Sequence, residues 1–140
     1  MKACAFCAIA RGEEAGHVVL ETDGVVAFLD RAPLVPGHTL VVTREHHATF
    51  DDVPLELLAP LLAAAQRLSV AMRRGLGADG SFTAINTRVS QSVAHVHLHV
   101  VPRREGDGLF RAGMVWIRKR YPAGEAERIA ARLREALDEA

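Results

Sequence analysis

Polar and apolar residues alternate most regularly in one segment, Ala94 to Val101, where three histidines (His95, His97, His99) are interleaved with Val96, Leu98 and Val100. Successive side chains of a β-strand point to opposite faces, so this segment is predicted to be a strand with three imidazoles on one face. The aliphatic face must be buried, which fixes the direction of the imidazole face. Neighbouring imidazoles should stand roughly 6 to 7 Å apart, close enough to bind one small ligand together.

Four other short segments have the apolar and β-branched composition of strands: 17–22, 25–30, 39–43 and 81–86. Asp23-Gly24 separates the first two and predicts an antiparallel hairpin with a type I′ turn, which needs positive φ at both central residues. Pro36-Gly37 precedes the third segment and suits positions i+1 and i+2 of a type II turn.

Leucine and alanine recur at three- and four-residue steps between Leu58 and Met72, which predicts a long amphipathic helix. Asp52 can cap its start with Pro54 in the first turn, and Arg73-Arg74-Gly75 is predicted to form its end. Pro60 should kink or restart this helix, because proline removes a helical hydrogen bond. A second amphipathic helix is predicted from Ala123 to Glu139.

Composition and charge are those of an ordinary folded domain. The 140 residues fit one domain with a real core, and 49 % are hydrophobic and 24 % charged. Seventeen basic residues balance seventeen acidic ones, so no membrane surface and no specific nucleic acid is expected as a partner. No apolar run approaches the length of a transmembrane helix, and Ala3 to Ala10 is too short for a signal peptide. Two cysteines without an export signal favour a reducing, cytoplasmic location.

Cys4 and Cys7 have the Cys-x-x-Cys spacing of half a zinc site, in which two thiolates and two further ligands complete a tetrahedron. Two other interpretations remain open. The thiols could have no role, or they could form a redox pair. A thioredoxin-like pair should follow a strand, and no strand could precede Cys4.

The pattern His-φ-His-φ-His-φ-φ, with φ apolar, resembles over its full length from His95 to Val101 the signature of the histidine triad (HIT) family of nucleotide hydrolases and transferases. From the residues alone, a histidine-rich edge strand or a His-x-His metal site remains open. The resemblance implies an α+β fold, a five-stranded antiparallel sheet with one long central helix and a C-terminal helix. It also implies a single HIT domain over 1–140, with its core in 4–102 and a C-terminal extension in 103–140.

The same resemblance implies a nucleotide site. Asp30 would accept hydrogen bonds from both ribose hydroxyls, and Phe28 would help to line the base pocket. Asn86, Gln91 and Ser92 would lie beside the phosphate. The alternative for Asp30 is a residue that starts a turn and bonds the local backbone, and the alternative for the other three polar residues is turn formation.

The resemblance also completes the metal site. His46 would be the third zinc ligand and His95 the fourth, giving a structural Cys₂His₂ site with Cys4 and Cys7 that pins the N-terminal segment to the strand carrying the chemistry. His47 is then expected to be the exposed neighbour of His46. No organic cofactor is expected.

A neutral imidazole with one nitrogen held as an N–H donor has a lone pair on the other and can attack phosphorus near neutral pH. The resemblance implies that His97 is this nucleophile, forming a nucleotidyl-histidine intermediate that water resolves. His99 would hydrogen-bond the phosphate or the leaving-group bridge. His17 and His38 are assigned no partner, one at a strand start and one in a turn.

The implied substrates are nucleoside phosphoramidates, dinucleoside polyphosphates or related adenylated compounds, and the implied assembly is a homodimer with joined sheets. Two alternatives stay open: a zinc-stabilised nucleotide-binding or scaffold protein with little turnover, and a metallohydrolase. Six basic residues lie between Arg103 and Arg120, either on a solvated surface or against a polyphosphate or other leaving group. Met114 to Ile117 is predicted to be a short strand that carries Trp116.

Overall fold

A computed structural model describes residues 4–111 and 116–139 of the chain. Its strands form one five-stranded sheet in the order β1-β2-β3-β5-β4, and every neighbouring pair is antiparallel. The predicted α+β fold is therefore confirmed. The strands are β1 (Val18–Glu21), β2 (Val25–Leu29), β3 (Thr39–Thr43), β4 (Gly80–Ile85) and β5 (His97–Arg103).

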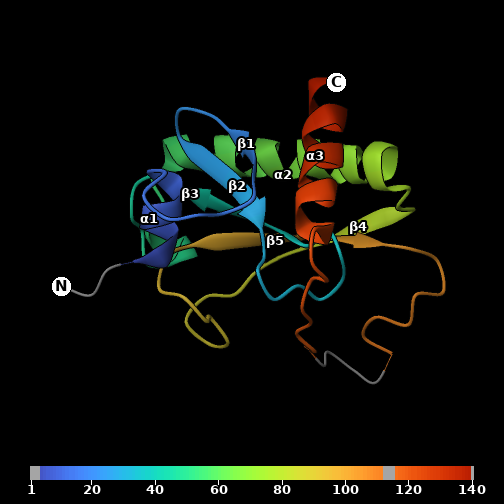
Figure 1. The fold of residues 1–140 in the computed structure, drawn as a ribbon. Coiled ribbons are helices and arrows are strands. Elements are labelled where there is room, and N and C mark those ends of the chain that lie inside the picture. Colours follow the sequence, from blue (N-terminus) through green and yellow to red (C-terminus); the bar gives the residue numbers. More distant parts are fainter. Residues whose placement is uncertain (1–3, 112–115, 140) are drawn as a thin grey trace.

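The helices cover the two faces of this sheet unequally (Figure 1). The long helix α2 crosses behind the sheet, and α3 packs against α2 and the β1–β2 side. The short helix α1 lies toward the opposite face, where it forms a second apolar cluster with β2 and β3. The helices are α1 (Ala5–Ala10), a 3-10 turn η1 (Phe50–Asp52), α2 (Leu55–Leu76) and α3 (Glu125–Asp138).

The strand that carries the histidines starts later than predicted. β5 begins at His97, and His95 lies in a bend just before it. The backbone leaves the ladder there because the Val96 N–H donates to the His47 carbonyl, 2.8 Å away in another loop. The predicted separation of faces nevertheless holds. His97 and His99 pair with Val42 and Leu40 of β3. The residues between and after them, Leu98 and Val100, belong to the core under α2 and α3.

The turn between β1 and β2 is not the predicted type I′ turn, because neither Asp23 nor Gly24 has positive φ. The Thr22 N–H donates to the Val25 carbonyl at 2.9 Å, and the Thr22 hydroxyl accepts from the Val25 N–H. Gly24 is needed for space instead. A Cβ at this position would lie 2.9 Å from the side chain of Leu57 on α2.

The turn before β3 follows the prediction. Gly37 has a φ of 100°, and the His38 N–H donates to the Val35 carbonyl at 3.1 Å. This is the geometry of a type II turn with Pro36 at i+1.

Helix α2 starts differently from the prediction and is not broken by its proline. Asp52 caps the 3-10 turn, because its carboxylate accepts from both the backbone and the hydroxyl of Thr49, and Pro54 is the N-cap of α2. Pro60 lies within the continuous helix. The carbonyl that loses its partner there belongs to Glu56, which is exposed, so water can replace the missing N–H.

The end of α2 lies two residues beyond the predicted cap. Gly77, with a φ of 68°, is the C-cap. Gly75 lies inside the helix, where a Cβ would approach both the Arg132 carbonyl and the Ala136 side chain of α3 to 2.9 Å. Glycine at position 75 therefore lets α2 and α3 pack closely.

Helix α2 is long and apolar enough, by length and mean hydropathy alone, to span a membrane. Its buried side chains, including Leu61, Leu68 and Met72, pack into the core that the sheet forms with α3. Half of the predicted strand from Met114 to Ile117, residues 114 and 115, lies outside the described residues. Trp116 and Ile117 have no regular structure.

Candidate active site

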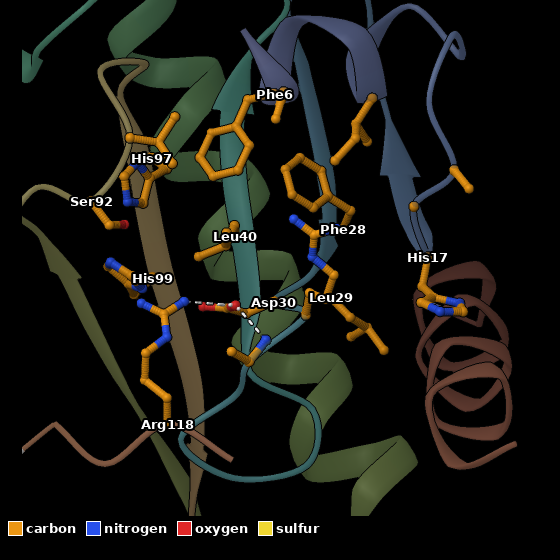
Figure 2. A pocket seen from close by; sticks show the side chains of 17 residues that line it. Phe6, His17, Phe28, Leu29, Asp30, Leu40, Ser92, His97, His99 and Arg118 are labelled. Atoms are coloured by element: carbon orange, nitrogen blue, oxygen red, sulfur yellow. Dashed lines mark hydrogen bonds and ion pairs between the residues drawn. The ribbon is translucent and has the colours of Figure 1, made fainter. Parts of the chain in front are cut away.

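A cavity of about 400 Å³ lies between α1 and the face of the sheet that carries His97 and His99 (Figure 2). Phe6 of α1 packs edge-on against Phe28 of β2, with ring centroids 5.3 Å apart, and against His97 at 5.2 Å. One part of the cavity is therefore aromatic and aliphatic, and the other is polar. The residues that define it are Phe6, Phe28, Asp30, Leu40, Ser92, His97, His99 and Arg118.

The protonation of His97 follows from its backbone contact. Its Nδ1 lies 2.8 Å from the His95 carbonyl oxygen, which can only accept, so Nδ1 carries the proton. The lone pair is then on Nε2, and the imidazole points into the cavity (Figure 2). Burial lowers the pKa of His97 below its usual 6.5, so the ring is neutral at neutral pH. This is the state that a nitrogen nucleophile needs.

A chain of two hydrogen bonds sets the opposite tautomer in His99. The Leu34 N–H donates to Nδ1 of His38 at 3.0 Å, so the proton of His38 is on Nε2. That Nε2–H donates to Nδ1 of His99 at 2.9 Å. His99 must therefore carry its proton on Nε2. Burial lowers the pKa of His38 and of His99 to about 3, so both rings stay neutral.

Asp30 is a buried carboxylate in the cavity wall. Its Oδ1 accepts from the Ala32 N–H at 2.9 Å, the local backbone bond expected of a residue that starts a turn. The same oxygen lies 3.3 Å from a guanidinium nitrogen of Arg118. Nε2 of His38 is 3.7 Å from Oδ2. Asp30 therefore stabilises the local turn through its bond to the Ala32 N–H, and its carboxylate also lines the cavity.

Of the three polar residues predicted beside the phosphate, only one lies at the cavity. Ser92 lines the cavity, whereas Asn86 and Gln91 do not. The side-chain oxygen of Gln91 accepts a hydrogen bond from the Arg88 N–H. Its side-chain nitrogen donates to the carbonyls of Ala48 and Val93. Gln91 thus fixes the loop that carries Ser92.

The four predicted metal ligands converge at the start of α1. The ligand atoms of Cys4, Cys7, His46 and His95 all lie within 4.8 Å of one another. Nδ1 of His95 is 3.3 Å from the Cys4 sulfur and 3.4 Å from the Cys7 sulfur, and Nδ1 of His46 is 3.4 Å from the Cys7 sulfur. Usual Zn–S and Zn–N bond lengths in a tetrahedron give an S···N separation of about 3.6 Å. The donor set and its spacing fit zinc.

Contacts around these ligands prepare them for a metal. Nε2 of His95 donates to the Thr43 carbonyl at 2.7 Å, which leaves the Nδ1 lone pair facing the sulfurs. Burial lowers the pKa of His95 to about 4, so the ring is neutral. The expectation for His47 is wrong. His46 is the exposed residue of the pair, although its Nδ1 contacts the Cys7 sulfur, and His47 is partly buried.

Sequence reasoning missed several residues of the site. Phe6 stands between the two cysteines, and no pattern predicted that a short helix would turn it toward the cavity. His38 directly follows the Pro-Gly turn, which is the one signal in the sequence that could have singled it out. Trp116 packs against His99 with ring centroids 4.9 Å apart, and Arg118 reaches Asp30. Both come from the segment in which sequence analysis named no individual ligand.

Comparisons with known proteins agree with this geometry. The profile of the HIT domain matches residues 11–106. A zinc-bound histidine triad family protein from Mycobacterium smegmatis has a TM-score of 0.85 and 38 % identity, covering 98 % of this chain and 94 % of that one. An uncharacterized HIT-like protein of Mycobacterium tuberculosis is 41 % identical over 96 % of this chain and 92 % of its own.

A more distant relative has a named activity. The adenosine 5′-monophosphoramidase of Saccharomyces cerevisiae is 35 % identical over 74 % of this chain, which spans 64 % of that protein. The matching profile covers more than half of the chain, the relatives align along most of it, and the fold and the histidine strand agree with both. The chain belongs to the histidine triad family.

Proposed function

We propose that the protein is a nucleotide hydrolase or nucleotidyltransferase that forms a covalent nucleotidyl intermediate on His97. The observation that carries this proposal is the hydrogen bond from Nδ1 of His97 to the His95 carbonyl, which leaves the Nε2 lone pair for the cavity. The named relative in yeast acts on a phosphoramidate, which supports nucleoside phosphoramidates as one substrate class. Dinucleoside polyphosphates are the second class.

In the first step, the Nε2 lone pair of His97 forms a bond to the α-phosphorus, and the bond from phosphorus to the leaving group breaks with its electron pair. A phosphate leaves as the anion, and an amine takes up a proton from solvent as it departs. The imidazole becomes positively charged, and its Nδ1–H strengthens its hydrogen bond to the His95 carbonyl. His99 donates its Nε2–H to a phosphate oxygen or to the departing atom, where negative charge develops. Its tautomer, fixed through His38, makes this donor available before substrate binds.

In the second step, water attacks the same phosphorus and the N–P bond breaks. The electron pair returns to His97, the water proton passes to solvent, and the nucleoside monophosphate leaves. An alcohol or phosphate acceptor in place of water gives nucleotidyl transfer.

The cavity divides into subsites that suit a nucleotide. Phe6, Phe28 and Leu40 offer an apolar slot for the base, and Asp30 offers carboxylate oxygens to the ribose hydroxyls. Ser92 lies on the polar side with His97 and can donate to a phosphate oxygen. The volume of about 400 Å³ lies within the range of ligand pockets.

We also propose that Cys4, Cys7, His46 and His95 hold a structural Zn²⁺. The bound ion would cross-link α1 to the loops before α2 and before β5. Burial and the neighbouring Cys4 thiol raise the pKa of Cys7, so this thiol needs a cation to replace its proton. The chain's own residues then hold Phe6 against the cavity and the His95 carbonyl against His97.

The proposed assembly is a homodimer through β4, an edge strand of the sheet. An apolar groove of about 570 Å³ lies beside β4 and α2, and Leu62 and Phe50 on its border are 58 % and 43 % exposed. An antiparallel strand edge is complementary to its own copy around a two-fold axis, which makes a second copy the occupant that fits.

Steady-state hydrolysis of adenosine 5′-phosphoramidate tests the reaction class. We expect the wild-type protein to release AMP and His97→Ala to lose this activity while still binding AMP in calorimetry. Binding of AMP without any product would instead make the chain a nucleotide-binding protein. Loss of turnover on chelation, restored by added metal while the protein stays folded, would identify a metallohydrolase.

A further inference from the structure

The segment from Trp116 to Tyr121 is held against the loop that precedes β3. The Lys119 N–H donates to the Pro33 carbonyl at 2.8 Å, and the Tyr121 hydroxyl accepts from the Gly37 N–H at 2.9 Å. Burial raises the pKa of Tyr121, so its hydroxyl stays protonated. These two contacts place the side chain of the residue just before Lys119 at the cavity.

That residue is Arg118, and its guanidinium lies among the polar groups of the site (Figure 2). Its partner is Asp30, whose side chain is 6 % exposed, whereas that of Arg118 is 47 % exposed. Because nearly half of the Arg118 side chain is exposed, the guanidinium can turn from this carboxylate to another anion that enters the cavity. The Arg118 guanidinium is therefore placed at the cavity but remains free to change its partner.

Two features indicate what Arg118 meets when the site is filled. A ribose that takes the Asp30 oxygens competes with the guanidinium for the same carboxylate. Figure 2 shows His97, His99 and Arg118 along the same side of the cavity, so a phosphate chain bound at His97 and His99 lies within the field of the guanidinium, which already acts on both imidazoles. Guanidinium groups bind phosphate oxygens bidentately, with stronger hydrogen bonds than neutral donors make.

We propose that Arg118 is a specificity-determining residue that exchanges Asp30 for an anionic leaving group, and that it thereby favours nucleoside polyphosphates over phosphoramidates. This inference rests on the proposed function, because it assumes attack at the α-phosphorus. A phosphoramidate releases ammonia or an amine, which gives Arg118 nothing to bind. A dinucleoside polyphosphate releases a nucleotide with several phosphate oxygens.

The test compares Arg118→Gln with Arg120→Gln, a control that removes an equal charge from an exposed residue of the same segment that does not line the cavity. The kcat/KM values for diadenosine triphosphate and for adenosine 5′-phosphoramidate are measured with the full chain. We expect Arg118→Gln to lower the first by about 10- to 100-fold and the second by less than about 3-fold. Arg118→Lys should recover part of the lost kcat/KM for diadenosine triphosphate. Arg120→Gln should leave the kcat/KM values for both substrates unchanged.

An equal change for both substrates in Arg118→Gln, including no change, would overturn the inference. A purely structural ion pair predicts equal losses. If the wild-type protein turns over neither substrate, the proposed function fails, and calorimetry with AMP and ADP tests Arg118 separately. We expect Arg118→Gln to reduce the preference for ADP over AMP by about 10-fold. An unchanged preference would then contradict a role for Arg118 in binding the outer phosphate.

Discussion

Replacing His38 with leucine should strongly destabilise the protein, because this side chain lies behind His99 and bonds two buried groups. The side chain is fully buried and bonds the Leu34 N–H on one side and Nδ1 of His99 on the other. Leucine is of similar size and leaves both groups without a partner. Each buried polar group left unsatisfied costs about 1–3 kcal/mol, so the free energy of unfolding should fall by about 2–6 kcal/mol. The folded fraction of this variant should keep part of its turnover, because His99 can still adopt the Nε2–H tautomer part of the time.

Urea unfolding at pH 7, followed by circular dichroism, measures this loss. His38→Gln is the matched control, because an amide can accept from Leu34 with its oxygen and donate to His99 with its nitrogen. It should recover more than half of the stability lost in His38→Leu. A leucine variant within about 0.5 kcal/mol of the wild type, or a glutamine variant as unstable as leucine, would refute the hydrogen-bonded chain.

Three further predictions concern acid, metal and assembly. In the folded protein His38 and His99 have a pKa of about 3, below the unfolded value of 6.5, so the unfolded chain binds more protons between these pH values. Stability should therefore be fully present above pH 6.5 and fall as the pH drops, in urea unfolding of chelated protein. His38 and His99 together contribute up to about 2.7 kcal/mol per pH unit below about pH 5.5, and His95 and His97, whose pKa values are also lowered, add to this slope. His38→Gln should lower the total slope by about half of the contribution of His38 and His99, and an unchanged slope would contradict the assignment. Cys4→Ser should clearly lower the amount of bound zinc, measured by metal analysis, and the melting temperature, measured by calorimetry. Turnover by the folded variant should change only slightly. A wild type without zinc and an unchanged melting temperature would exclude the metal site. Leu62→Glu should convert a dimer to a monomer in light scattering, and a monomeric wild type or a dimeric variant would contradict the β4 interface.

The strands and the two long helices could be predicted because their patterns are local. β3 has the bounds that its composition indicates, and the alternation around His97 gives the correct faces. Helix α1 has six residues, which is too short for a periodic pattern, and its N-cap is Cys4, whose sulfur accepts from the Cys7 N–H. Asp23-Gly24 does not form the predicted type I′ turn. The Thr22 hydroxyl instead accepts from the Val25 N–H, and the Asp-Gly dipeptide alone does not reveal this contact.

The parts of the candidate site that lie in a sequence motif could be predicted. His97 and His99 come from the histidine pattern, and Phe28, Asp30 and Ser92 come from the family resemblance and line the cavity. The proposed metal ligands come from the Cys-x-x-Cys motif together with that resemblance. His38 and Arg118 could not be predicted, because their partners are 61 and 88 residues away in sequence and each contact exists only after the sheet and the C-terminal segment have folded. The tautomers of His97 and His99 also required the structure, since they depend on which backbone or imidazole group faces each nitrogen.

Attack of His97 on phosphorus can be tested by trapping the covalent intermediate. Wild-type protein is mixed with adenosine 5′-phosphoramidate, quenched within milliseconds at alkaline pH and digested with trypsin. We expect an acid-labile adenylyl group on His97, in the peptide between Arg88 and Arg103, and no such adduct in His97→Ala. Full turnover by His97→Ala, or an adenylyl group on another residue, would contradict nucleophilic attack by His97.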